Sequence, residues 1–415
     1  MNQSPQEFWI NVHGLTPGMF VTRLDRPWLG TNYPLEGFQV GSEAEARELQ
    51  SLCNFVAVDG TRGVSPDLRY VELRPPDVVR HARGEDEILE LRKTQWQLRT
   101  DFDTELPQAE KAHDAMKQAI AEVMRDLEQG RDLQLGKLRD GVEAMIDSIT
   151  RNPAAFSWLK AIKHKDNYAY HHALGCSVWA ASFGRHLGMD RTELGELALS
   201  GLLFDVGKTR VPAAVLISDG PLAEGDLQLA RRHVQHGLDI LDGSPGISPR
   251  ILEAVATHHE RHDGSGYPNG LIGSQIPMPG RIIGLIDTYD AITSTRPFMQ
   301  SRSPHHAVME LYQGRDVLFQ AELVEQFIQT CGIYPSGSLV ELSDGRVCVV
   351  TSVHSLKRLR PSVMLLLDAG KKPLSEFHPL DLSEVRTGVD GETLSIKRGL
   401  PEGAYGIDPA ELFLN

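Results

Sequence analysis

The most informative run of the sequence is His258-His259-Glu260-Arg261-His262-Asp263-Gly264-Ser265-Gly266-Tyr267-Pro268. Two adjacent histidines close the apolar helix expected over 251–257, and a glycine-rich loop follows at once. Side chains of neighbouring helix residues point about 100° apart, but at a helix end the backbone loosens and both imidazoles can turn toward one ion. The run therefore predicts a metal or acid–base site at the end of a helix.

Other residues of the chain also have the chemistry of metal ligands. Nine of the 16 histidines of the chain lie between His164 and His262. Neutral imidazoles with a carboxylate able to bridge suit a divalent Fe, Mn, Zn or Ni ion. The candidate ligands are His172, Asp205, His233, His258, His259 and Asp287.

The composition of the 415-residue chain excludes several classes of function. Asp and Glu number 56 against 42 Lys and Arg, so an acidic chain with a net charge of −14 makes a nucleic-acid polymer an unexpected partner. No stretch approaches the roughly 18 apolar residues of a membrane span, and we expect no secretory signal and no membrane association. Four scattered cysteines fit reduced thiols, so we expect a cytoplasmic protein.

The chain outside the histidine-rich part predicts a mainly α fold with two smaller units. Residues 18–24 and 55–59 read as strands, and 42–49 as a helix capped by Ser42. Residues 338–342 and 347–350 read as a hairpin around Asp344-Gly345, and 363–367 as a further strand. We expect a regulatory mixed α/β N-terminal domain with a connecting helix over 1–150, a helical catalytic domain over 151–330 and a β-rich unit over 331–415.

The connecting segment from about 110 to 149 carries apolar residues at steps of three and four, which is typical of an amphipathic helix. Gly130 and Gly136 interrupt the pattern, so one broken helix and two separate helices both stay open. Its role is open too: it packs on its own domain, or it signals or dimerises between two domains.

The run HHE-x3-G-x-G-YP resembles the signature of the HD-GYP domain, a branch of the HD phosphohydrolase superfamily that hydrolyses the second messenger cyclic di-GMP. The resemblance extends from about 166 to 296. It includes the Asp-Val-Gly-Lys of 205–208, the His-x3-Gly of 233–237, the Asp-x2-Asp-Ala of 287–291 and the Arg-Pro-Phe of 296–298. Residues 17–19 and 24–28 resemble the uncharacterised domain often found upstream of HD-GYP domains, and the C-terminal strands resemble their usual tail.

The resemblance implies a metal-dependent phosphodiesterase that opens cyclic di-GMP to linear pGpG, with further cleavage to GMP left open. It assigns His172, Asp205 and Asp287 to one metal and His233, His258 and His259 to a second, with Asp205 bridging. Asp205 and Lys208 are then the catalytic residues, and Lys208, Tyr267, Asp290 and Arg296 bind substrate. For Asp290, support of a ligand is the alternative role, because it lies one helical turn after Asp287.

Three departures from the family pattern bear on these expectations. The name-giving His-Asp pair is here Phe204-Asp205, and phenylalanine cannot ligate a metal. Met299 stands where many members have a phosphate-binding Lys, and Tyr168 where some have a Glu that supports a third metal. We therefore expect two or fewer divalent ions, Fe, Mn or similar.

The same departures leave a second function open. A degenerate HD-GYP domain could act as a non-catalytic cyclic di-GMP sensor or as a protein-interaction module. Candidate partners are cyclic di-GMP itself, diguanylate cyclase domains that contact the GYP loop, and a second copy of the chain in a homodimer.

Overall fold

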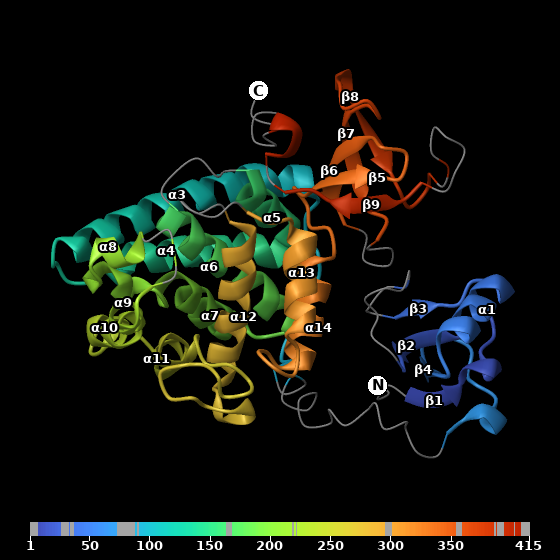
Figure 1. Cartoon of the computed structure of the whole chain (residues 1–415), viewed down its shortest axis with the longest axis horizontal. Coiled ribbons are helices and arrows are strands. Elements are labelled where there is room, and N and C mark those ends of the chain that lie inside the picture. Colours follow the sequence, from blue (N-terminus) through green and yellow to red (C-terminus); the bar gives the residue numbers. More distant parts are fainter. Residues whose placement is uncertain are drawn as a thin grey trace. The chain divides into compact units, whose positions relative to one another are not determined.

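The computed structural model describes residues 7–25, 33, 37–72, 88, 91–162, 168–217, 220, 222–294, 301–353, 359–385, 387, 394–401 and 403–407. It confirms the predicted fold class: a mainly helical protein with a small antiparallel sheet toward each end of the chain (Figure 1). The chain forms two compact units, one made mainly of the residues up to Asp86 and the other beginning at Glu87. The domain boundaries proposed at 150 and 330 stay predictions.

The N-terminal unit is a four-stranded antiparallel sheet with one helix. The strands are β1 (Glu7–Asn11), β2 (Phe20–Leu24), β3 (Phe38–Gln39) and β4 (Phe55–Asp59), in the order β1-β4-β2-β3. Helix α1 (Glu43–Leu52) begins as predicted at Ser42, whose hydroxyl accepts a hydrogen bond from the Glu45 N–H. The core of this N-terminal unit includes the buried side chains of Ile10, Val21, Leu49 and Val56.

The connecting segment forms two helices, α3 (Phe102–Glu128) and α4 (Leu135–Arg151). Gly130 adopts a φ of 72° beyond the end of α3, in the left-handed region that favours glycine, whereas Gly136 lies inside α4. Both helices pack against helices of the second unit, α3 against α5 (Pro153–Ile162) and α4 against α7 (Arg191–Leu203). The structure thus resolves the open alternative in favour of two helices.

The other helices described in the second unit include those that carry or precede the candidate ligands. They are α6 (Tyr168–Leu187), α8 (Ala213–Leu216), α9 (Glu224–Arg231), α10 (His233–Leu241), α11 (Pro249–Thr257), α12 (Met278–Thr293), α13 (Pro304–Gln313) and α14 (Ala321–Cys331), with a short 3-10 helix, η3, at Val206–Arg210. Among the described residues, no helix is both long and apolar enough to cross a membrane.

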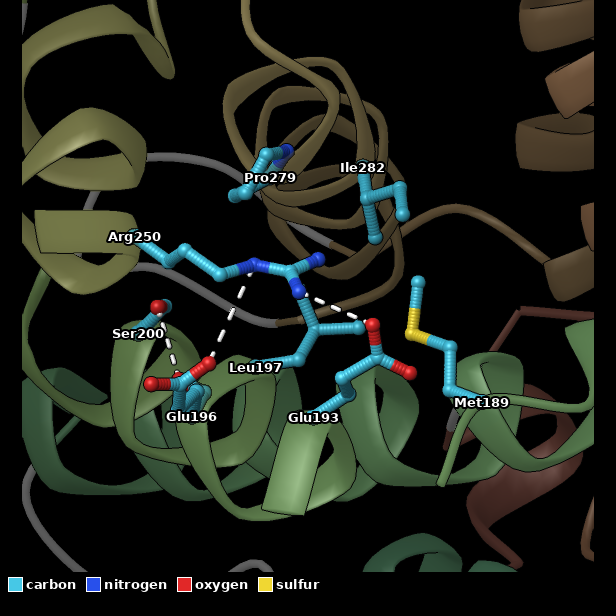
Figure 2. A pocket seen from close by; sticks show the side chains of 8 residues that line it. All are labelled: Met189, Glu193, Glu196, Leu197, Ser200, Arg250, Pro279 and Ile282. Carbon is cyan, nitrogen blue, oxygen red and sulfur yellow. Dashed lines mark hydrogen bonds and ion pairs between the residues drawn. The ribbon is translucent and has the colours of Figure 1, made fainter. Parts of the chain in front are cut away.

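An ion pair holds α7 against α11, the two helices that lead into the candidate site. Glu193 completes a capping box with Asp190 at the start of α7, and its carboxylate lies 2.9 Å from the guanidinium of Arg250, the second residue of α11 (Figure 2). Helix α7 ends just before Asp205, and α11 ends just before His258. Because the ion pair connects the starts of α7 and α11, it helps to fix the two helices that lead into Asp205 and His258.

The second unit ends in a five-stranded antiparallel sheet. Its strands are β5 (Leu339–Leu342), β6 (Val347–Ser352), β7 (Ser362–Leu367), β8 (Pro373–Asp381) and β9 (Ile396–Gly399), in the order β8-β7-β6-β5-β9. The predicted hairpin is confirmed: the Gly345 N–H donates to the Leu342 carbonyl, and Gly345 has a φ of 85°.

Candidate metal centre

The six predicted ligands meet in one part of the helical unit, although they come from five separate places in the sequence. His172 lies on α6, Asp205 follows α7, His233 begins α10, His258 and His259 follow α11, and Asp287 lies on α12. His172, His233 and His258 are buried, and the other three are half-buried. The structure thus brings together every metal ligand expected from the resemblance.

Four of these residues converge on one point. Nε2 of His233 lies 3.4 Å from Oδ1 of Asp205, and Nε2 of His258 lies 3.9 Å from the same oxygen. Nε2 of His233 is 3.4 Å from Nε2 of His258 and 3.1 Å from Nε2 of His259. One ligand atom from each of the four residues falls within 4.8 Å of the others, a spacing suited to a shared ion.

Backbone carbonyls set which ring nitrogen faces the centre. Nδ1 of His233 lies 2.7 Å from the Ala230 carbonyl, and Nδ1 of His258 lies 2.8 Å from the Val255 carbonyl. A carbonyl accepts only, so each Nδ1 carries the proton and each neutral ring presents an Nε2 lone pair to the centre. Two lone pairs 3.4 Å apart repel each other unless a cation lies between them.

The electrostatics favour the forms of these residues that bind a metal. Burial lowers the pKa of His258 to about 4 and that of His259 to about 2, so both rings are neutral near pH 7. Burial opposes ionisation of Asp205, but Lys208 and the surrounding histidines outweigh it and hold its pKa far below the usual range. Its buried Oδ1 has no hydrogen-bond partner. Such an oxygen beside imidazole lone pairs fits a divalent cation.

The other half of the site is organised around His172. Its Nε2 lies 3.1 Å from Oδ1 of Asp287 and 4.0 Å from Oδ2 of Asp205, and its Nδ1 lies 2.9 Å from Oδ2 of Asp290. Burial by itself lowers the pKa of His172, but Cys176 and the hydrogen bonds with Asp287 and Asp290 raise it well above its usual value. The two carboxylates thus favour the protonated ring, whose positive charge takes the place of an ion's at this position.

Phe204 fills the place between the two halves. It is fully buried, and its ring packs edge-to-face on His172 at 5.7 Å and on His258 at 5.0 Å between centroids. An imidazole here could supply a further nitrogen ligand, whereas the phenyl ring contributes only apolar contact. The donor set is therefore complete around Asp205, His233, His258 and His259, and poorer around His172 and Asp287.

Asp290 lies behind His172 and not at the opening of the site. Its side chain is fully buried, and Oδ1 lies 2.8 Å from the ammonium of Lys160 on α5. It binds the Nδ1 side of His172, which leaves Nε2 facing Asp205 and Asp287. Of the two roles expected for Asp290, this placement supports orientation of a ligand, because a substrate has no access to a fully buried carboxylate.

The opening of the site carries one ammonium and one aromatic ring. Lys208, whose side chain is 42% exposed, pairs with Asp205 Oδ2. Tyr267 stacks on His259 with centroids 4.6 Å apart and 24° between the ring planes. The third residue expected here, Arg296, lies outside the described residues, as does Met299.

One residue at this opening, Arg231, was not predicted from the sequence. The guanidinium carbon of Arg231 lies 4.8 Å from the centre of the Tyr267 ring, and its Nε is buried without a hydrogen-bond partner. Among the described residues no carboxylate forms an ion pair with it. In the sequence, the pair Arg231-Arg232 stands immediately before His233. This pair predicts a basic residue near the site but does not indicate which of the two arginines faces the site.

Two motif glycines allow the close backbone approaches that build the site. A Cβ on Gly207 would lie 1.9 Å from the His233 carbonyl oxygen, so η3 can pack on the start of α10 only without a side chain there. A Cβ on Gly266 would lie 2.4 Å from the backbone nitrogen of Arg261. These glycines bring Asp205 to His233 and fold the GYP loop back over His259.

Family models match three successive parts of the chain. One described as an HD domain matches residues 144–323, one described as a domain of unknown function (DUF3391) matches residues 9–138, and one described as a KOW domain associated with HD domain matches residues 339–388. These matches agree with the resemblance drawn from the sequence motifs.

Relatives of known activity match over different lengths. A cyclic di-GMP phosphodiesterase of Pseudomonas aeruginosa is 30% identical over 97% of this chain and 92% of its own. A cyclic di-GMP phosphodiesterase response regulator of Xanthomonas campestris is 32% identical over 43% of this chain and 50% of its own. A 3'3'-cGAMP-specific phosphodiesterase of Vibrio cholerae is 26% identical over 51% of this chain and 41% of its own. The first match extends over all three segments identified above.

Proposed function

Because the chain belongs to the family of HD-domain cyclic di-GMP phosphodiesterases, we propose that it hydrolyses cyclic di-GMP in a metal-dependent reaction with linear pGpG as the first product. The single observation that carries the proposal is the convergence of Asp205, His233, His258 and His259 on one point, with the Nε2 lone pairs of His233 and His258 facing inward. The same four residues are the ones that would hold the ion.

A divalent ion bound there would polarise the phosphodiester and acidify a water molecule. The residues of the chain supply the rest of the reaction. Lys208, held at the opening by Asp205, is placed to neutralise charge on the scissile phosphate. Tyr267 and Arg231 form a flat, cationic edge on which a guanine base or a second phosphate can rest.

We infer the number and identity of the ions from the donor set. Three imidazoles and a carboxylate suit a divalent ion such as Fe or Mn, and they would hold the first ion. A second ion would use His172, Asp287 and the bridging Asp205, but without the imidazole that Phe204 replaces. We propose that the chain holds two ions or fewer, with the second bound more weakly.

Phe204 also favours a second candidate function. A chain that binds one ion and cyclic di-GMP but turns over slowly would act as a cyclic di-GMP sensor or an interaction module. The two candidates differ in turnover and agree in ligand binding, so turnover separates them.

The deciding experiment measures metal content and turnover on the same sample. The chain is purified anaerobically, loaded with Mn²⁺ or Fe²⁺, assayed for metal per chain, and incubated with cyclic di-GMP. Release of pGpG is the expected result, and later GMP would show a second cleavage. A metal-loaded chain without turnover would overturn the enzyme and leave the sensor. Parallel incubation with 3'3'-cGAMP tests the substrate.

The wider setting extends the proposal. Residues 1–150 would regulate a catalytic domain of 151–330, with 331–415 as an accessory β-rich unit. Diguanylate cyclase domains would contact the GYP loop around Tyr267, and two copies of the chain would form a homodimer. The proposed location is the cytoplasm, because cyclic di-GMP is found there and its reducing conditions suit the four free cysteines.

A further inference from the structure

Lys160 is a largely buried cation that the proposed reaction does not use. It lies on α5 with its side chain 13% exposed, and its ammonium lies 2.8 Å from Oδ1 of the fully buried Asp290 on α12. Burying two charges costs free energy that their attraction repays only in part, so such a pair is weak evidence for stability. Its place directly behind the metal ligand His172 points to a role in the site.

The two oxygens of Asp290 have different partners. Oδ2 lies 2.9 Å from Nδ1 of His172 and accepts a hydrogen bond from the Ser294 hydroxyl at 3.1 Å. Oδ1 is buried, and among the described residues it accepts no hydrogen bond, so its ion pair with Lys160 is the contact that holds it. The ammonium therefore fixes one end of this carboxylate, while His172 and Ser294 fix the other.

Gly175 on α6 leaves the space in which the ammonium and the carboxylate meet. A Cβ at this position would lie 2.5 Å from Oδ1 of Asp290 and 3.1 Å from Cε of Lys160. The first distance is far inside van der Waals contact, so a side chain here would push the carboxylate away from its partners. Gly175 stands one helical turn after His172, which places this gap beside the ligand.

The orientation of His172 depends on the same carboxylate. Asp290 binds the Nδ1 side of the ring, so Nε2 faces Asp287 at 3.1 Å. We call His172, Asp287 and the bridging Asp205 the second metal position. We propose that Lys160 is a positioning residue for the second metal position, because it fixes the Asp290 carboxylate that orients His172. The inference rests on the proposed role of His172 as a metal ligand.

Positioning and charge predict opposite effects when the ammonium is removed. As a positive charge near the site, Lys160 repels a metal ion, so its loss would tighten metal binding. As the anchor of Asp290, its loss leaves a buried carboxylate oxygen without a partner and frees the ring of His172, so metal binding weakens. The sign of the change in affinity therefore separates the two roles.

The test titrates Mn²⁺ into the full, metal-free chain and follows free Mn²⁺ by electron paramagnetic resonance, which gives the number of bound ions and their affinities. Wild type and Phe204→His are both titrated, since the added imidazole strengthens the second metal position. In both backgrounds we expect Lys160→Met to weaken binding of the second ion about tenfold or more, the lower end of the effect of losing a group that supports a ligand. The first ion should change by less than about twofold, which also shows that the variant is folded.

Two further variants separate positioning from a general loss of packing. Lys160→Arg keeps the charge, and a cavity of about 80 Å³ beside Lys160 has room for the larger group, so this variant should restore most of the affinity for the second ion. Gly175→Ala keeps Lys160 but displaces the carboxylate of Asp290, so it should weaken the second ion as Lys160→Met does. Gly175→Ala decides the question if Lys160→Met does not fold.

Lys137→Met is the matched control, because this ammonium also joins two helices, through its ion pair with Glu122, but lies on the exposed surface of α4. Its affinity for both ions should equal that of the parent chain. In the Asp290→Asn background, Lys160→Met should no longer weaken the second ion, because the two residues act through one contact. An equal loss in both backgrounds would show that Lys160 acts without Asp290 and would overturn the proposal.

Three other results would overturn it. They are tighter binding of the second ion in Lys160→Met, an unchanged second ion in Gly175→Ala, and a single bound ion in both wild type and Phe204→His. None of these titrations measures hydrolysis. A chain that binds a second ion in a Lys160-dependent way but does not turn over cyclic di-GMP would contradict the proposed activity and leave this inference standing.

Discussion

Phe204 is the residue on which the number of bound ions depends. Its ring packs on both His172 and His258, and an imidazole in its place would add a ligand to the poorer half of the site around His172 and Asp287. We predict that Phe204→His raises the metal content per chain, measured by elemental analysis after loading with Mn²⁺, and raises turnover of cyclic di-GMP about tenfold or more, since loss of a supporting group alone typically costs 10–100-fold. Without metal, the buried polar ring should destabilise the chain by about 1–3 kcal/mol.

Phe204→Leu is the control for this variant, because it changes the packing without adding a ligand. It should leave the metal content unchanged and destabilise the chain through the smaller side chain. Equal metal content in Phe204→His and Phe204→Leu would show that the limiting defect lies elsewhere in the site.

Arg231 is expected to bind substrate through charge. A charge-assisted hydrogen bond to phosphate contributes about 1.5–3 kcal/mol. We predict that Arg231→Gln raises KM for cyclic di-GMP roughly 10- to 100-fold with little change in kcat, measured by steady-state kinetics. The neighbouring Arg232 is exposed, so Arg232→Gln is the matched control and should leave KM within about twofold. Equal effects of both variants would indicate long-range attraction without a specific contact.

At this scale the sequence predicted a set of candidate ligands that the fold brings together, and a supporting role for Asp290, but not the contacts of Lys160 and Arg231. His233, His258 and His259 stand in short motifs whose spacing predicts a metal site. Lys160 and Arg231 stand in no motif, because their roles depend on which helix packs against which. The contact of Lys160 with Asp290 joins α5 to α12. A local sequence pattern does not predict which helices pack against each other.

At the scale of elements, the clamp between α7 and α11 holds the ligand-bearing ends in place. Glu193 accepts from the Arg250 guanidinium at 2.9 Å and from Lys93 at 2.7 Å, and it closes the capping box of α7 (Figure 2). We predict that Glu193→Gln lowers the free energy of unfolding by about 1–2 kcal/mol at pH 7, measured by urea denaturation, because a cap and the ion pairs of a buried carboxylate with two partly exposed cations are both weakened.

The pH dependence of this effect has a definite sign. Burial raises the pKa of Glu193, but Lys93 and Arg250 outweigh it, so the folded-state pKa lies below 4.5. The stabilisation is therefore complete above about pH 5 and is lost as the pH falls through the folded-state value. Glu196, 3.8 Å from Arg250 and outside the cap, provides the control, and Glu196→Gln should cost less. A loss for Glu193→Gln that is undiminished at pH 3 would contradict the ionic origin.

The helix boundaries show which part of the fold the sequence could specify. Ser42 and Asp344-Gly345 acted as predicted, because a cap and a tight turn are local structures. Gly130 and Gly136 looked equivalent in the sequence, yet only Gly130 adopts a positive φ. A Cβ on either glycine would meet nothing within 4 Å, so the space around them does not distinguish the two. What differs is their place: Gly130 lies in the turn between α3 and α4, which pack against each other, and Gly136 lies inside α4.

At the scale of the whole molecule, the two compact units have separate cores and only one contains the metal centre. The N-terminal core is built from residues such as Ile10, Leu49 and Val58, far in sequence from the ligands. Units of this kind usually unfold in separate transitions. A ligand stabilises only the unit that binds it, by about 2.7 kcal/mol at a concentration 100 times its Kd.

We predict two transitions in differential scanning calorimetry, of which one rises with Mn²⁺ and falls with a chelator while the other stays fixed. Binding to Asp205, His233, His258 and His259 adds stability to the helical unit alone, and at this size each 1 kcal/mol moves a midpoint by about 2–4 °C. A chain lacking residues 1–86 should keep the metal-sensitive transition and lose the other. A single transition that moves as a whole with Mn²⁺ would show instead that the N-terminal unit is energetically coupled to the metal centre, as a regulatory domain with a rigid link to it would be.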